Sequence, residues 1–228
     1  PGLTAPYRHL VLAPFPPSLL APGQPARPTR VAVRPAPTAA PSATDVPGWL
    51  GGLPPREAAP RVYATFGTLL RPEDGVPLLR AVLDSLAGEP VRVIVTVGPQ
   101  TDPAALGAPP PNAHVEQYVP QEALLPHCDL VLCHGGSGTL LGALDHGLPL
   151  VVVSLRADQP ENARAAAEAG AAVVVAPEAV TPARVRGAVR AALGEPGYRA
   201  SARRVQAELH ALPPMAHAVQ LLEGLAAG

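Results

Sequence analysis

From residue 61 onward, short apolar runs alternate with stretches of helical spacing. The apolar runs predict strands at Arg61–Phe66, Arg92–Val97, Ala113–Gln117, Leu130–Cys133, Leu150–Val153 and Ala172–Val175. The helical spacing predicts helices at Val76–Ala87, Thr139–His146, Glu161–Ala169, Thr181–Leu193, Tyr198–Leu212 and Met215–Leu225, with at most a short helix at Ala123–His127. Strands that alternate with helices predict an α/β fold with a doubly wound parallel sheet, because right-handed crossovers place helices on both faces.

Residues 1–60 have a different character, because they hold many of the 32 prolines and show little periodicity. Tyr7–Leu12 is one possible strand, and Asp45–Leu53 a possible short helix anchored by Trp49. Proline fixes φ and removes a hydrogen-bond donor, so the pattern predicts that most of Ala13–Pro60 is an extended surface segment or linker. We therefore expect the core domain to begin at Arg61.

A glycine-rich turn, His134–Thr139 (HGGSGT), lies between a predicted strand and a predicted helix. Such a turn directs unpaired backbone N–H groups outward at the positive end of the helix dipole, which suits a phosphate group. Ligands of doubly wound sheets bind at the carboxyl ends of the strands. The positions predicted at those ends are Gly67-Thr68, Tyr118, His134–Thr139 and Asp158-Gln159.

Composition narrows the classes of partner and compartment. The net charge is −1 and no basic block is present, which argues against nucleic acid as the main partner. With only Cys128 and Cys133, neither a disulfide framework nor a zinc site is indicated, and a reducing cytoplasm fits best. No apolar run approaches the ~18 residues of a membrane span, and the first residues lack the layout of a signal peptide.

Three other kinds of site fit the turn poorly. A dinucleotide fold needs G-x-G-x-x-G after the first strand, where this chain has Phe66-Gly67-Thr68. A nucleophile elbow, G-x-S-x-G, fails at Thr139, although His134 and Asp158 are conceivable partners of Ser137. A P-loop is excluded because all 17 basic residues are Arg and its lysine is therefore absent.

The turn also carries a resemblance to a known family. His134–Thr139, Ala143-Leu144, Gly147-Leu148-Pro149 and Asp158-Gln159 with Asn162 resemble the donor signature of family 1 nucleotide-sugar glycosyltransferases. Two outlying pieces agree, Thr65–Thr68 on the first strand and Tyr118–Gln121 before the turn. The match runs from about Arg61 to Pro177 and is most similar to actinobacterial enzymes that glycosylate macrolides, enediynes and other natural products.

The resemblance implies the GT-B fold, in which two Rossmann-like domains face each other. It implies that residues 1–60 are the end of an N-terminal domain plus the interdomain linker, and that residues 61–228 are the donor-binding domain. The acceptor and the catalytic base would lie on the N-terminal domain, so we expect no catalytic residue in this chain and no turnover by the chain alone. Met215–Leu225 would cross back toward that domain.

The resemblance also implies a role for each residue at the strand ends. His134 would reach the donor diphosphate, helped by the N–H groups of Gly136, Ser137, Gly138 and Thr139. Thr68 would contact phosphate or sugar, and Tyr118 would stack on the base, with the Val119 backbone and Gln121 nearby. Asp158 and Gln159 would hold sugar hydroxyls. For some of these residues a plain structural role remains open: Asp158 or Thr139 as a helix cap, Thr68 as a turn residue, and Asn162 as a support of the helix start.

The implied function is transfer of a sugar from a nucleoside-diphosphate donor to a hydrophobic small-molecule acceptor, without a metal or other cofactor, a nucleic acid or a membrane span. The alternative is a stand-alone nucleotide-sugar-binding or partner module without catalysis. Many members of the family place a Glu, which holds the ribose hydroxyls, where this chain has Gly142. Without that carboxylate a 2′-hydroxyl gains no partner, which predicts a dTDP-linked sugar, unless Gly142 is only a packing choice and another residue or water holds the ribose.

Overall fold

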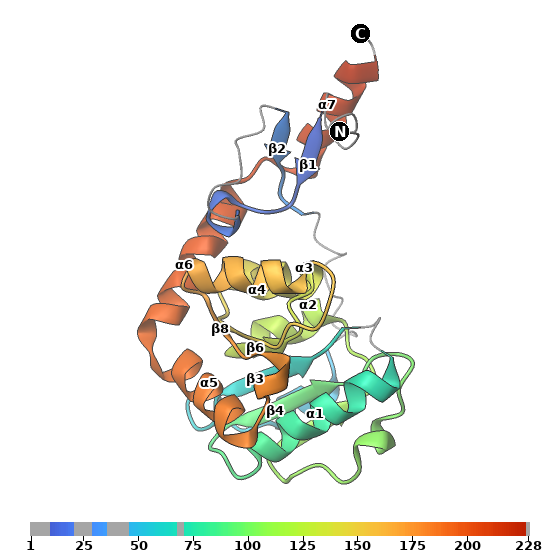
Figure 1. Cartoon of the computed structure of the whole chain (residues 1–228), viewed down its shortest axis with the longest axis vertical. Helices are drawn as coiled ribbons and strands as arrows, with labels where there is room; N and C mark the ends of the chain where they lie inside the picture. Colours follow the sequence, from blue (N-terminus) through green and yellow to red (C-terminus); the bar gives the residue numbers. More distant parts are fainter. Residues whose placement is uncertain (1–9, 21–28, 36–45, 68–70, 227–228) are drawn as a thin grey trace.

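A parallel sheet of six strands forms the centre of the molecule, which we describe from a computed structural model (Figure 1). The structure describes residues 10–20, 29–35, 46–67 and 71–226. The strands of this sheet are β3 (Arg61–Thr65), β4 (Arg92–Thr96), β5 (Ala113–Glu116), β6 (Leu130–Cys133), β7 (Leu150–Val152) and β8 (Ala172–Val174). Each lies within one residue of its predicted bounds, so the periodicity of the apolar runs located all six.

The strand order is β5-β4-β3-β6-β7-β8, and every pair is parallel. Chain order therefore reverses between β3 and β6, which are neighbours in register from Val62↔Leu130 to Thr65↔Cys133. A crevice forms at the carboxyl ends of strands at such a switch point, because the connections leave toward opposite faces. The predicted doubly wound parallel sheet is confirmed.

Helices cover both faces of the sheet. On one face α1 (Pro72–Leu86) and α5 (Pro182–Gly194) enclose a core of Val and Leu side chains from the strands. On the other face a second core includes side chains of α2 (Gln121–Leu124), α3 (Ser137–Asp145), α4 (Gln159–Glu168) and α6 (Pro196–Ala211). Thr181 caps α5, its hydroxyl accepting from the Arg184 N–H at 3.3 Å. Short 3₁₀ helices lie at Pro103–Leu106, Leu125–His127 and Pro177–Ala179.

The proline-rich N-terminal part contains more structure than its composition predicts. β1 (Val11–Ala13) and β2 (Arg30–Ala32) form a separate parallel pair, and β1 begins later than the predicted Tyr7–Leu12, of which residues 7–9 lie outside the described residues. The prediction of an extended linker after Ala13 is thus wrong for β2 and for the 3₁₀ helix η2 (Pro17–Leu19). Leu19 of η2 is buried in the core cluster that includes α6 side chains. This tertiary contact stabilises a segment whose local sequence does not favour regular structure.

A second 3₁₀ helix, η3 (Gly48–Gly52), confirms the short helix predicted around Trp49. The Trp49 ring stacks on His114 of β5, with ring centroids 3.9 Å apart, and the neighbouring Leu50 is 4% exposed. At the other end of the chain, α7 (Met215–Ala226) lies beside β1 and β2 in Figure 1. The Arg34 N–H donates to the Pro213 carbonyl at 2.7 Å, which joins the segment after β2 to the residues before α7.

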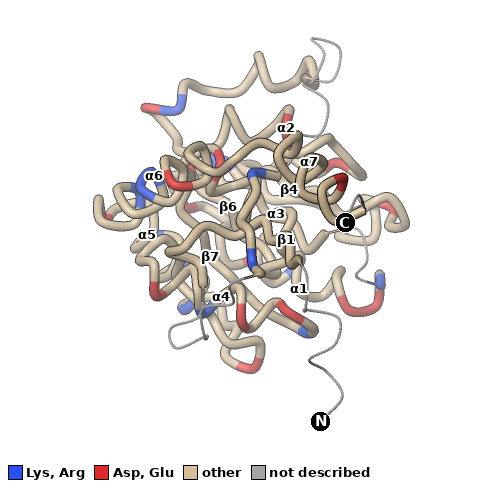
Figure 2. The backbone as a smooth tube through the Cα atoms, turned by 90° about the horizontal axis from the view of Figure 1, so that it is seen from above, with Lys and Arg blue, Asp and Glu red and all other residues tan. Residues whose placement is uncertain are grey.

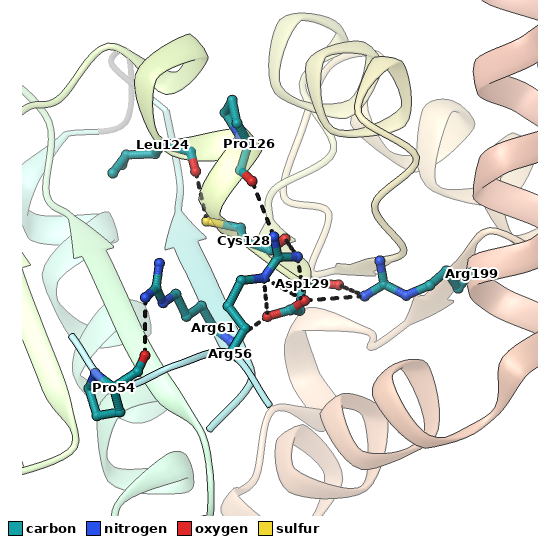
Figure 3. A network of polar contacts seen from close by, with 8 residues as sticks. All are labelled: Pro54, Arg56, Arg61, Leu124, Pro126, Cys128, Asp129 and Arg199. Atoms are coloured by element: carbon teal, nitrogen blue, oxygen red, sulfur yellow. Dashed lines mark hydrogen bonds and ion pairs between the residues drawn. The ribbon is translucent and has the colours of Figure 1, made fainter. Parts of the chain in front are cut away.

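A polar network closes the amino ends of β3 and β6 (Figure 3). The Asp129 carboxylate accepts from the guanidinium of Arg56 and, at 2.9 Å, from the backbone N–H of Arg61. Arg199 of α6 donates to the Asp129 carbonyl at 2.7 Å, and Arg56 donates to the Cys128 carbonyl at 2.7 Å. The network therefore joins the segment before β3 to β6 and α6.

Along the described residues, basic and acidic positions are interspersed on the backbone (Figure 2). None of the helices in the described ranges is both long and apolar enough to cross a membrane. Cys128 and Cys133 are free and buried in the core.

Candidate functional site

Two cavities lie at the carboxyl ends of the strands around the switch point. The tyrosine cavity, of about 280 Å³, lies at the ends of β3 and β4 and is bounded by Tyr118. The histidine cavity, of about 430 Å³, lies over the turn after β6 and the loop before α4. Gly67, Gly138 and Thr139 line both cavities, so the two share a border.

His134 stands directly after β6 and lines the histidine cavity. A Cβ atom at Gly67, where φ is +80°, would lie 2.9 Å from its ring, and one at Gly136 would lie 2.4 Å from its Nε2 atom. A side chain at either position would displace the imidazole, because real Cβ atoms do not approach so closely. The imidazole therefore occupies the space that these two glycines leave beside the turn.

The protonation of His134 follows from its burial. Desolvation lowers the pKa of His134, although the charge of Asp158 partly opposes this shift. Its Nδ1 atom is buried without a hydrogen-bond partner. Burying an unpaired N–H is costlier than burying an unpaired acceptor, so we infer the neutral tautomer with its proton on Nε2. That proton is then available to an anion in the cavity.

The turn leads directly into α3, whose N-cap is Gly136 without any side-chain cap. The first N–H groups of a helix have no partner within the helix, so those of Ser137, Gly138 and Thr139 face a ligand or solvent. The interpretation of Thr139 as a helix cap is therefore wrong, because Thr139 stands inside the first turn. Its side chain lines both cavities instead.

Asp158 faces the turn from the loop before α4. Its Oδ2 atom accepts from the Ser137 hydroxyl at 2.9 Å and from the Asn162 amide at 3.0 Å, and these hydrogen bonds lower the pKa of Asp158. The same amide donates to the Gly135 carbonyl at 3.0 Å. Asp158 stands at the N-cap position of α4, as the capping interpretation expects, but its side chain makes no capping hydrogen bond to the backbone of the helix.

Gln159, the first residue of α4, shapes the loop before it. Its Oε1 atom accepts from the backbone N–H groups of Leu155 and Arg156 at 2.9 and 3.1 Å. Ala157, which follows Arg156 in this loop, has a positive φ of 57°, a strained conformation for alanine. Arg156 lines the histidine cavity and pairs with Asp74 of α1 at 3.3 Å.

Tyr118 presents a large ring at the tyrosine cavity, with 57% of the residue exposed, while Val119 is buried below it. Gln121 follows, and its amide donates to the Gly138 carbonyl at 3.3 Å. A Cβ atom at Gly142 would lie 2.9 Å from the Gln121 Nε2 atom and 3.3 Å from Leu125 Cδ1. Gly142 thus makes room for Gln121, so at least part of its role is packing.

The structure adds three buried hydroxyls to the predicted site, those of Tyr63, Thr65 and Thr96 on the wall of the tyrosine cavity. Tyr63 and Thr96 are hydrogen bonded at 2.8 Å, and Thr96 donates to Thr65 at 3.1 Å. Burial raises the pKa of Tyr63 to about 12, so its hydroxyl stays protonated. The sequence signal that could have located these hydroxyls is a threonine at the last position of two strands. Thr65 and Thr96 are cross-strand partners, so both hydroxyls lie at the same edge of the sheet.

The turn, Asp158 and Gln159 line one cavity; Tyr118, Val119 and Gln121 line the other. Thr68 lies outside the described residues. Ser137 bonds to Asp158 and Asn162 but not to His134, which removes the basis of a nucleophile elbow. Within the described ranges no group of three or more His, Cys, Asp or Glu residues is placed to hold a metal ion.

Solved structures share this fold over nearly the whole chain. The spinosyn rhamnosyltransferase SpnG superposes with a TM-score of 0.80 at 33% identity, over 94% of this chain and 56% of that one. A structure of SpnG complexed with thymidine diphosphate gives the same TM-score at 32% identity. The fold is therefore that of the GT-B glycosyltransferases, of which this chain spans one part.

Sequence relatives agree. The chain is 37% identical over 179 residues to 4′-demethylrebeccamycin synthase of Lentzea aerocolonigenes, and 38% identical over 185 residues to tylactone mycaminosyltransferase of Streptomyces fradiae. These matches cover 78% and 80% of this chain but 41% and 40% of the relatives. Residues 80–225 match the C-terminal domain of erythromycin biosynthesis protein CIII-like proteins, and the chain belongs to that family.

Proposed function

We propose that this chain is the donor-binding half of a glycosyltransferase that moves a deoxysugar from dTDP to a hydrophobic natural-product aglycone. The observation that carries the proposal is the pair of bordering cavities, one beneath an exposed aromatic ring and one over an anion-binding turn. A nucleoside diphosphate has the same two parts, a flat base and a charged diphosphate. The relatives named above are glycosyltransferases, which supports this reaction class.

In this proposal the base stacks on Tyr118 and the diphosphate lies on the turn at the start of α3. The N–H groups of Ser137, Gly138 and Thr139 and the Nε2 proton of His134 donate to phosphate oxygens. Charge grows on the diphosphate as the sugar leaves. Donors already fixed at that place stabilise the transition state more than the ground state, which is how this half of the enzyme contributes to rate.

The occupied atoms of Asp158 and Gln159 determine what each offers the sugar. Asp158 Oδ2 accepts from Ser137 and Asn162, so Oδ1 is the oxygen left for a sugar hydroxyl. Gln159 Oε1 accepts two backbone N–H groups, so its amide Nε2 is left as a donor. The pair thus presents one acceptor and one donor, which matches a hydroxyl together with a neighbouring sugar oxygen.

The assignment of dTDP rests on the lack of a carboxylate at Gly142. Gln121 fills the space that Gly142 leaves, and its amide is a donor already directed at Gly138. A ribose 2′-hydroxyl there would find no carboxylate acceptor from residue 142, whereas a 2′-deoxyribose needs none. A solved neighbour of the chain was crystallised with thymidine diphosphate, which supports the same nucleotide.

Isothermal titration calorimetry of the purified chain tests this binding. We expect dTDP to bind more tightly than UDP by about 5- to 30-fold, the equivalent of about 1–2 kcal/mol, and we expect EDTA to change neither affinity. UDP binding as tight as dTDP binding would overturn the nucleotide assignment alone. A chain that binds neither nucleotide would overturn the proposed function.

We further propose that residues 1–60 are the end of an acceptor-binding domain plus its linker, that residues 61–228 form the donor domain, and that the enzyme works in the cytoplasm. The relatives are longer than this chain, and the residues just before α7 are joined to the segment after β2 by the hydrogen bond from Arg34 to Pro213. The general base that deprotonates the acceptor hydroxyl would then lie on the other domain. The chain alone should transfer no sugar to any acceptor, and turnover above a heat-killed control would contradict this division and the lack of a catalytic residue.

A further inference from the structure

An acidic side chain, that of Glu122, lines the tyrosine cavity. Glu122 is the second residue of α2 and is half-buried. Among the described residues that line this cavity, it alone carries a charged side chain. Its carboxylate makes no hydrogen bond or ion pair with the part of the chain that the structure describes. Both carboxylate oxygens are therefore left as acceptors for a ligand in the cavity.

The position of Glu122 is electrostatically unfavourable for an anionic ligand. Gly138 and Thr139 line the tyrosine cavity together with Glu122, and they also line the histidine cavity, where the proposed function places the diphosphate. A carboxylate on the wall of the adjoining cavity repels that diphosphate. Glu122 therefore weakens binding unless it also accepts a hydrogen bond from the same ligand.

The place of Glu122 along the cavity wall indicates which part of the ligand supplies the donor. Tyr118 bounds the cavity at the end where the base is proposed to stack. The Gln121 amide donates to the Gly138 carbonyl at 3.3 Å, which holds the start of α2 against the start of α3. Glu122 follows Gln121 directly, on the stretch of wall between Tyr118 and the turn. The part of a nucleotide that lies between its base and its phosphates is the sugar of the nucleoside.

We propose that Glu122 is a nucleotide-binding residue whose carboxylate accepts from the 3′-hydroxyl of the nucleoside sugar. The inference rests on the proposed function, since it takes the nucleotide and its orientation from there. The 3′-hydroxyl is the only hydroxyl on the 2′-deoxyribose of dTDP. UDP carries the same hydroxyl, so this contact leaves the preference for dTDP to the lack of a carboxylate at Gly142.

The 3′-deoxy analogue of dTDP isolates this contact, because it differs from dTDP only by that hydroxyl. Calorimetry with the two ligands would compare the wild-type chain with Glu122→Ala and Glu122→Gln. We expect the wild type to prefer dTDP by about 10- to 100-fold, as for a hydrogen bond to a charged acceptor, and Glu122→Ala by less than about 3-fold. Glu122→Gln keeps a neutral acceptor and should show an intermediate preference. Because the ratio is taken within each variant, a change in the repulsion of the diphosphate cancels.

Glu178→Ala is the matched control. Glu178 is an exposed glutamate on the 3₁₀ helix Pro177–Ala179, lines neither cavity, and its variant should keep the wild-type preference for dTDP over the 3′-deoxy analogue. An equal preference in the wild type and in Glu122→Ala would overturn the inference and leave the proposed function intact. A third ligand, UDP, tests the choice of hydroxyl. If Glu122→Ala weakened UDP more than dTDP, the carboxylate would hold the 2′-hydroxyl and the assignment would be wrong. A wild-type chain that binds neither dTDP nor UDP would remove the proposed function and this inference together.

Discussion

The two ends of the strand pair β3 and β6 serve different purposes. At the amino ends, Asp129 accepts from Arg56 and from the N–H of Arg61, and Arg199 donates to its carbonyl (Figure 3). At the carboxyl ends, beyond Thr65 and Cys133, the chain instead borders two cavities, and His134 lines one of them. His134 Nδ1 is buried without a partner; the buried Nε atom of Arg61 at the amino ends also lacks one, but Arg61 lines neither cavity.

This difference shows where the fold stores stability and where it keeps binding capacity. A paired buried charge holds segments together. An unpaired donor beside a cavity lowers the stability of the free protein, and a ligand that accepts from it restores that stability. Substitutions at the amino ends should therefore change unfolding and leave binding alone. Substitutions at the carboxyl ends should mainly change binding.

Asp129→Ala should have the largest effect on stability. It removes the acceptor of Arg56 and weakens the contact with Arg199, and we expect a loss of about 2–3 kcal/mol in the free energy of unfolding, less than for a fully buried pair. Urea denaturation measures this loss, and calorimetry on the folded variant should give the wild-type affinity for dTDP. The control is Asp84→Ala, which breaks an exposed i,i+4 pair with Arg80 and should cost about 0.5 kcal/mol or less. Equal losses of unfolding free energy in the two variants would contradict the stabilising role assigned to the amino ends of β3 and β6.

His134→Ala should have the largest effect on binding. The loss of a hydrogen bond to a charged group corresponds to about 1.5–3 kcal/mol of dTDP affinity. Its effect on unfolding should be smaller than that of Asp129→Ala, because neither ring nitrogen has a hydrogen-bond partner in the described structure. His127→Ala, on the 3₁₀ helix before β6 and in neither cavity, is the control. An unchanged affinity in His134→Ala would contradict the place assigned to the diphosphate.

Asn162→Ala tests a residue that is well paired although it lies at the binding end. Its amide supports both Asp158 and the Gly135 carbonyl, so we expect about 1–2 kcal/mol less stability. Binding of dTDP-glucose, used as a probe, should fall more than binding of dTDP, because Asp158 is the proposed sugar contact. The measurement is the ratio of the two affinities, and a constant ratio would argue against that contact.

Acid should produce the smallest of these effects. Burial lowers the pKa of His134 in the folded chain, so the unfolded chain binds the extra proton first as the pH falls. The neutral ring therefore contributes stability that is present above the unfolded pKa and is lost as the pH falls through the folded one. Denaturation between pH 7.5 and pH 5 should show a loss in the wild type that is reduced in His134→Ala. Identical pH profiles of the two chains would show that His134 is not the group responsible.

The six central strands and the turn after β6 were predictable because their signals are local. A buried strand repeats apolar residues over a short window, and the conformation of a turn depends on its own glycines. The family signature also located most of the candidate site. The pattern failed for β2 and η2, because their segments are proline-rich and their order comes from contacts with distant residues. One such contact is the burial of Leu19 in the core.

By itself the sequence determined the α/β class, the approximate ends of the strands and the chemical character of the turn, since each depends on residues close together along the chain. Only the tertiary structure decided which side chains meet. It placed Gln121 in the space left by Gly142, directed Asp158 to the Ser137 hydroxyl, and joined Thr65 to Thr96 across two strands. The physical reason is that a hydrogen bond depends on distance in space, and residues 31 positions apart become neighbours only when their strands pair.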